Sequence, residues 1–133
     1  MNSFNLAIFF ILSILCGAIL EIIFEKLHFL LTKSHYKIHH FTLGKYFFLL
    51  LFPGIAILFI GKVYDWAILN VFLIFALLGT FLEFLVGWFY QKIEGQRLWT
   101  YHKYSISKFT SYLSIPLWGF CGVAFWLIAK ALT

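Results

Sequence analysis

Four long apolar stretches, separated by short links that hold most of the charge, constrain this chain more than any other feature. They lie near residues 5–30, 46–61, 66–90 and 112–131. An α-helix needs about 20 apolar residues to cross a bilayer core of roughly 30 Å. We therefore predict an all-α integral membrane protein, a bundle of four transmembrane helices in a single domain that spans residues 1–133.

The composition supports a membrane location, because 63% of the residues are hydrophobic and 11% are charged. A soluble domain of this size buries only about two-thirds of the surface that its unfolded chain exposes, so it could not hide this much apolar surface. The net charge of +5 comes from Lys and Arg in the links, where these side chains suit lipid headgroups better than nucleic acid. We expect membrane lipids as partners and no nucleic-acid binding.

The chain also contains an internal repeat at an offset of about 62 residues. The clearest matches pair Gly17 with Gly79, Glu21 with Glu83, His40 with His102, Lys45 with Lys108, and Pro53 with Pro116. Matches of charged residues and proline in the same order are rarely accidental. They predict two tandem parallel helix-hairpin repeats, about 5–61 and about 66–131, related by an axis along the membrane normal.

The charges of the links orient the predicted bundle. The links after the first and third stretches hold Lys26, Lys33, Lys37, Lys45, Lys92, Arg97, Lys103 and Lys108, whereas the opposite side holds Lys62 and Lys130. Links rich in Lys and Arg remain on the cytoplasmic side of a membrane. We therefore expect an integral protein of the cytoplasmic (plasma) membrane, with the basic links in the cytoplasm and both termini outside.

Glu21 and Glu83 are the main candidates for binding a ligand or a proton. They occupy matching depths in the first and third predicted spans, where a carboxylate is costly and normally faces a partner or water. Two such groups near one axis would have to hold a proton or share a cation. Glu25, one turn beyond Glu21, would extend the polar track toward the cytoplasm. The alternative is a structural clasp, in which these carboxylates pair with basic residues of the links.

The second long link, residues 91–109, interleaves aromatic and basic side chains. Arg97, His102 and Lys103 could bind a lipid headgroup or another anion beneath the glutamate pair. The alternative is an amphipathic anchor that lies in the membrane interface. Pro53 and Pro116 fall inside predicted spans, where proline usually kinks a helix.

The histidines do not predict a metal site. His35, His39 and His40 lie close together, but no Cys or Asp accompanies them, and a site needs three or four converging ligands. The chain also lacks the recognised motifs of nucleotide binding and hydrolysis. We expect no metal, no cofactor and no enzymatic activity. A lipid-modifying membrane enzyme is the weakest of the alternatives.

One family is suggested by residues 72–127. Glu83 in a helix, a Gly87-Trp88 turn, Trp99 and Tyr101 near the headgroups, and a final Trp118-Gly119 helix together resemble the CmpB-like ABC-transporter permeases, a family of small multi-span membrane proteins. The resemblance implies a transporter or permease subunit, and it adds Trp99 and Tyr101 to the candidates for headgroup or anion binding. The chain has no ATPase site of its own, so the resemblance also implies a separate ATPase partner.

Two functions therefore stay open. In the first, the chain is a transporter or permease subunit with a paired intramembrane glutamate site. In the second, it is a non-catalytic membrane scaffold or a lipid-binding helper protein. We expect a homo-oligomer in the first case, because four helices make a thin wall around any pathway.

Overall fold

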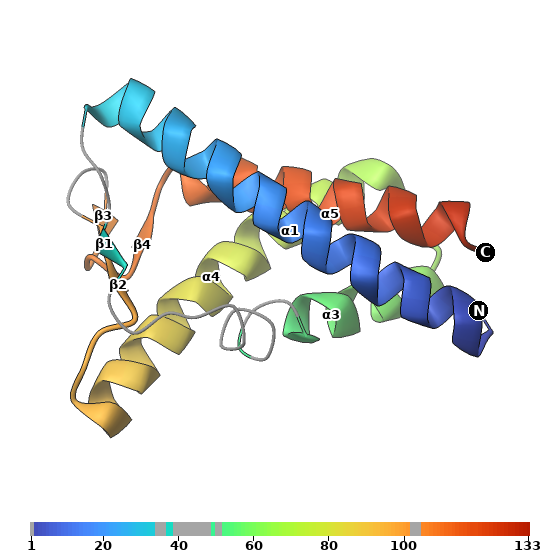
Figure 1. Cartoon of the computed structure of the whole chain (residues 1–133), viewed down its shortest axis with the longest axis horizontal. Coiled ribbons are helices and arrows are strands. Elements are labelled where there is room, and N and C mark those ends of the chain that lie inside the picture. Colours follow the sequence, from blue (N-terminus) through green and yellow to red (C-terminus); the bar gives the residue numbers. More distant parts are fainter. Residues whose placement is uncertain (1, 34–36, 39–48, 50–51, 102–104) are drawn as a thin grey trace.

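The structure is a computed structural model that describes residues 2–33, 37–38, 49, 52–101 and 105–133. Within these ranges the chain is mostly helical, as the sequence predicts (Figure 1). The helices are α1 (Ser3–Thr32), α3 (Phe52–Val63), α4 (Ile68–Glu94) and α5 (Ser114–Ala131).

Three of these helices, α1, α4 and α5, are long and apolar enough to cross a membrane. The apolar stretch predicted at 46–61 corresponds in part to α3, whose 12 residues extend for about 18 Å. This length is below the roughly 30 Å of a bilayer core. Most of the residues just before α3 lie outside the described part of the chain.

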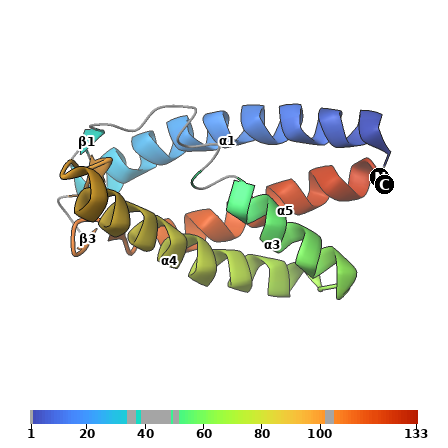
Figure 2. The ribbon, with the colours of Figure 1, turned by 90° about the horizontal axis from the view of Figure 1, so that it is seen from below.

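The helices run back and forth between two ends of an elongated molecule. α1 and α4 both run from the end that holds the two termini toward the opposite end, and α5 returns (Figure 1). The termini are joined by a hydrogen bond of 2.8 Å, which the side-chain amide of Asn5 donates to the carbonyl of Leu132. Seen from below, α5 lies between α1 and α4, and it contacts both of them (Figure 2).

Glycines allow α4 and α5 to approach closely. A Cβ atom added at Gly79 of α4 would lie 2.6 Å from the indole of Trp118 in α5. Gly122 of α5 in turn receives the ring of Phe75 in α4. Small residues of this kind are characteristic of helix interfaces in membranes, where close van der Waals contact replaces the hydrophobic effect. The contact between α4 and α5 is the most extensive in the structure.

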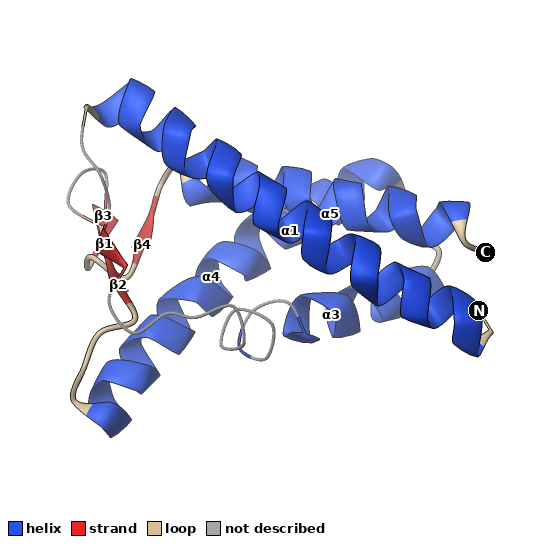
Figure 3. Ribbon diagram, in the orientation of Figure 1, coloured by secondary structure: helices blue, strands red, loops and turns tan. Residues whose placement is uncertain are grey.

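Four short strands lie at the end opposite the termini (Figure 3). They are β1 (Lys37–Ile38), β2 (Trp99–Thr100), β3 (Ser105–Ile106) and β4 (Thr110–Ser111). β1 pairs with β2, which joins the two basic links, and β3 pairs with β4 as a hairpin. The all-α prediction did not include these strands, because two-residue strands are too short to show an alternating pattern.

The two prolines lie close to the first described residues of α3 and α5. Pro53 is the second residue of α3 and Pro116 is the third residue of α5. A residue in the first helical turn has no intrahelical partner for its N–H, so proline costs no hydrogen bond there. The structure places Pro116 in the first turn of α5, and the kink predicted there stays a prediction. Residues 50–51 lie outside the described part of the chain, so the kink predicted at Pro53 also stays a prediction.

Candidate functional site

Glu83 occupies a buried position where α4 faces the first turns of α5. Its side chain is only 6% exposed. Gly79 and Gly87 lie one turn before and after it, so all three share the inward face of α4. The indole Nε1 of Trp118 donates a hydrogen bond of 2.8 Å to Oε2 of Glu83. Gly79 makes this contact possible, since a side chain at that position would occupy the space of the indole.

Two hydroxyl groups from the segment between α4 and α5 complete the surroundings of this carboxyl. Tyr101, just after β2, and Thr110 of β4 are both buried, and both interact with Glu83. Among the described residues, neither Oε1 of Glu83 nor Oγ1 of Thr110 has a hydrogen-bond partner, although both atoms are buried.

The segment that supplies these hydroxyls forms a cap, defined as residues 98–101 and 109–111. The two halves are joined by a hydrogen bond from the Trp99 indole to the Phe109 carbonyl. The Tyr101 amide also donates a hydrogen bond of 3.0 Å to the carbonyl of Lys108, the residue just before the second half. The guanidinium of Arg97 lies 4.3 Å from the centre of the Phe109 ring. This cation–π contact and the buried aromatic rings hold the cap against the end of α4.

The cap also contacts α1. The rings of Phe24 and His28 in α1 lie 6.4 Å and 5.9 Å from the ring of Tyr101, centre to centre. His28 is fully buried, and its Nδ1 lies 3.4 Å from the hydroxyl of Thr32. Aromatic pairs at these separations stabilise a contact by about 0.5–1.5 kcal/mol. The cap is therefore the point at which α1, α4 and α5 come together around Glu83.

The three predicted glutamates differ in their surroundings. Glu21 is partly buried in α1 and lies near enough to Glu83 for their charges to interact. Glu25 is exposed. In the part of the chain that the structure describes, no Lys or Arg forms an ion pair with Glu83.

The predicted headgroup candidates are found in different places. Trp99 and Tyr101 are buried in the cap, and Arg97 is partly buried against it. His102 and Lys103 lie outside the described residues, as do His35, His39 and His40. Among the described residues, no group of three or more His, Cys, Asp or Glu side chains could hold a metal ion.

Sequence reasoning alone missed Thr110 and His28 as neighbours of the site. Thr110 belongs to no motif, and its hydroxyl reaches Glu83 only because the chain turns back at the β3–β4 hairpin. The spacing of Phe24 and His28, one helical turn apart on α1, was the one available signal. This spacing shows that Phe24 and His28 lie on the same face of α1, but it does not show which segment packs against that face.

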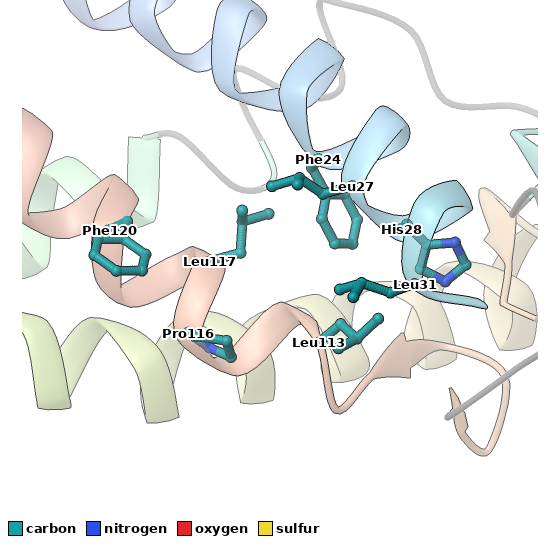
Figure 4. Close-up of a pocket in the computed structure, with 8 residues that line it drawn as sticks. All are labelled: Phe24, Leu27, His28, Leu31, Leu113, Pro116, Leu117 and Phe120. Atoms are coloured by element: carbon teal, nitrogen blue, oxygen red, sulfur yellow. The ribbon is translucent and has the colours of Figure 1, made fainter. Parts of the chain in front are cut away.

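A separate apolar groove of about 150 Å³ lies between the second half of α1 and the first half of α5 (Figure 4). Its lining comprises Phe24, Leu27, His28, Leu31, Leu113, Pro116, Leu117 and Phe120. The lining is almost entirely apolar, and Leu31 and Phe120 are 64% and 61% exposed at its rim. Phe24 and His28 line this groove and also contact Tyr101 of the cap, so the groove and the cap are adjacent.

The comparisons with known proteins agree with the resemblance found in the sequence. A family model described as "Putative ABC-transporter type IV" matches residues 7–133. This match confirms the family that the Glu83 and Trp118-Gly119 motifs suggested. Neither the curated proteins nor the solved structures include a significant match.

Proposed function

This chain belongs to the Putative ABC-transporter type IV family, and on that premise we propose that it is a small transporter or permease subunit with its ligand or proton site at Glu83. Glu21 is the second carboxyl of the site, and Glu25 lies on the path toward the basic end. The subunit has no catalytic activity of its own and works with a separate ATPase partner.

The observation that carries this proposal is the carboxyl group of Glu83, which is buried without a basic partner among the described residues. Burying a carboxyl in a membrane protein is costly, and such groups commonly mark the path of an ion or substrate. A purely structural clasp would instead require a Lys or Arg at hydrogen-bond distance. Glu21 is nearby and has the same sign of charge, which increases the need for a bound proton or cation.

The arrangement of the helices also suits a transporter subunit. α1 and α4 run in the same direction, and each holds one member of the repeat-related pair Glu21 and Glu83, as two tandem parallel hairpins require. In this proposal α3 and the residues before it form the second of four spans. Lys33, Lys92 and Arg97 lie at the strand-bearing end, which we assign to the cytoplasm, with both termini outside. Since four helices enclose little space, we propose a homo-oligomer.

Reconstitution into proteoliposomes tests the transporter proposal directly. Proton flux is followed with a trapped pH-sensitive dye, and sodium or potassium flux with trapped ion-sensitive dyes, under an imposed gradient. We expect Glu83→Gln to abolish the flux and Glu21→Gln to reduce it. Glu94→Gln is the control, because Glu94 is exposed at the end of α4, outside the proposed site and path, and its loss should have a small effect. Wild-type protein without flux, or Glu83→Gln with wild-type flux, would refute the proposal.

The second candidate, a lipid-binding helper or scaffold, is favoured by the apolar groove between α1 and α5. In a bilayer such a groove accepts an acyl chain, and its rim of exposed Leu31 and Phe120 faces the space where lipid would lie. Native mass spectrometry of the purified protein would measure retained phospholipid. Leu117→Trp should fill the groove and reduce retention, whereas Leu127→Trp, at an exposed position of the same helix, should not. Equal retention in both variants would contradict this candidate.

A further inference from the structure

We propose that the ligand of Glu83 is a proton, held on Oε1 and shared with the hydroxyl of Thr110 at neutral pH. The inference rests on the proposed function, because it names what the same site binds. Its starting point is a pair of buried oxygen atoms, Oε1 of Glu83 and Oγ1 of Thr110, that interact but have no hydrogen-bond partner among the described residues.

A single proton resolves both positions. Oε2 of Glu83 already accepts the hydrogen bond from the Trp118 indole, so it acts as the carbonyl oxygen of a neutral carboxyl. A proton on Oε1 converts that atom from an acceptor into a donor, and the Thr110 hydroxyl then accepts from it. An ionised Oε1 would instead accept from the Thr110 hydroxyl, so the charges around the carboxyl decide between the two arrangements.

The charges around the carboxyl favour the protonated form. Among the described residues, the titratable groups that interact with Glu83 are Glu21 of α1, Cys121 of α5 and Tyr101 of the cap. Each of them is either neutral or negative, and none can compensate an ionised Glu83. A neutral, protonated Glu83 avoids both the repulsion from Glu21 and the cost of burying a charge.

The basic groups near the site that the structure describes, Arg97 and His28, contact other residues. Arg97 stacks on Phe109, and its Nε lies 3.5 Å from the Trp99 carbonyl that it hydrogen-bonds. His28 of α1 packs its ring against Tyr101 and lies beside Thr32. A divalent cation would need about six oxygen ligands, and the described site offers far fewer. The proton is therefore the ligand that the surroundings of Glu83 fit best.

Infrared spectroscopy of the reconstituted protein tests this inference without any transport assay. A protonated carboxyl gives a carbonyl stretching band that shifts when the sample is moved into deuterated water. We expect this band in the wild type at neutral pH, its loss in Glu83→Gln, and its retention in Glu94→Gln, since Glu94 is exposed at the end of α4. Trp118→Phe should move the band to higher frequency, because it removes the donor to the carbonyl oxygen Oε2.

Stability provides a second measurement. The amide of Glu83→Gln has the shape of a protonated carboxyl and can accept from Trp118 while donating to Thr110. We expect this variant to melt within about 2 °C of the wild type at neutral pH, whereas Glu83→Ala should melt lower. A large loss of stability in Glu83→Gln would show that the ionised form is the native one and would overturn the inference.

Two further outcomes would also overturn it. The first is a band that appears only under acidic conditions, as for an ordinary exposed carboxyl. The second is a wild-type protein that is more stable in sodium than in choline at equal ionic strength, when Glu83→Gln shows no such difference. That result would identify a cation site at Glu83. The inference and the proposed function can fail separately. A protein with the band but without flux refutes transport alone, and a protein with flux but without the band refutes the proton site alone.

Discussion

The substitution Gly79→Ala probes the contact on which the whole site depends. A Cβ atom at this position would lie 2.6 Å from Cγ and Cδ2 of Trp118, whereas carbon atoms in contact are normally about 3.5–4.0 Å apart. The indole cannot turn away without losing its hydrogen bond to Glu83. Either α5 must move by about 1 Å or that hydrogen bond must break.

Both outcomes lower the free energy of unfolding. Overpacking of a close interface costs about 1–3 kcal/mol. Loss of the Trp118–Glu83 hydrogen bond costs about 1–3 kcal/mol, because the carboxyl oxygen remains buried. Since the two outcomes are alternatives, we expect a decrease of about 1–3 kcal/mol. Reversible unfolding in mixed micelles, followed by circular dichroism, would measure this decrease.

Gly54→Ala is the matched control for this experiment. Gly54 is also a buried helical glycine, but a Cβ atom there would meet only Cε1 of Phe75 at 3.7 Å, which is ordinary contact. We expect the free energy of unfolding of Gly54→Ala to rise by less than about 1 kcal/mol, because alanine has a better helix propensity than glycine. If Gly79→Ala were as stable as Gly54→Ala, the proposed interlock of Gly79 with Trp118 would be refuted.

Two further substitutions test the ends of the bundle. Arg97→Ala removes the cation–π contact with Phe109, so it should reduce the free energy of unfolding by about 1 kcal/mol and lower the melting temperature. Lys108→Ala, at an exposed turn, is the control and should leave the melting temperature unchanged. Equal melting temperatures of the two variants would contradict a supporting role of Arg97. Asn5→Leu removes the hydrogen bond to the Leu132 carbonyl, at a cost of about 0.5–1.5 kcal/mol, and should speed hydrogen exchange in the last turn of α5. Unchanged exchange there would show that the two termini are held together by other contacts.

The membrane-spanning helices were predictable because their signal is local. Length and apolarity are properties of a continuous segment, and α1, α4 and α5 have both. Helix starts were less predictable. Pro116 was predicted to lie inside a span because the apolar run begins before it, yet the helix begins at Ser114. Apolar side chains continue across the boundary, so hydrophobicity alone does not mark the first turn.

The surroundings of Glu83 were only partly predictable. The sequence singles out this residue because a carboxyl within an apolar run is unusual. Its partners come from other parts of the chain, namely Trp118 on α5, and Tyr101 and Thr110 on the cap. Hydrogen-bond partners of this kind depend on how segments meet in space. No periodicity within α4 predicts them.

Glu21 and Glu83 show most clearly what the sequence determined and what the tertiary structure decided. The sequence placed both in apolar helices, four residues after a glycine and at equivalent positions of the predicted repeat. The structure buries Glu83 and leaves Glu21 only partly buried. The physical reason is that α5 packs closely on the glycine-bearing face of α4 and contacts α1 less extensively, so that only one of the two carboxyls is enclosed by neighbouring side chains.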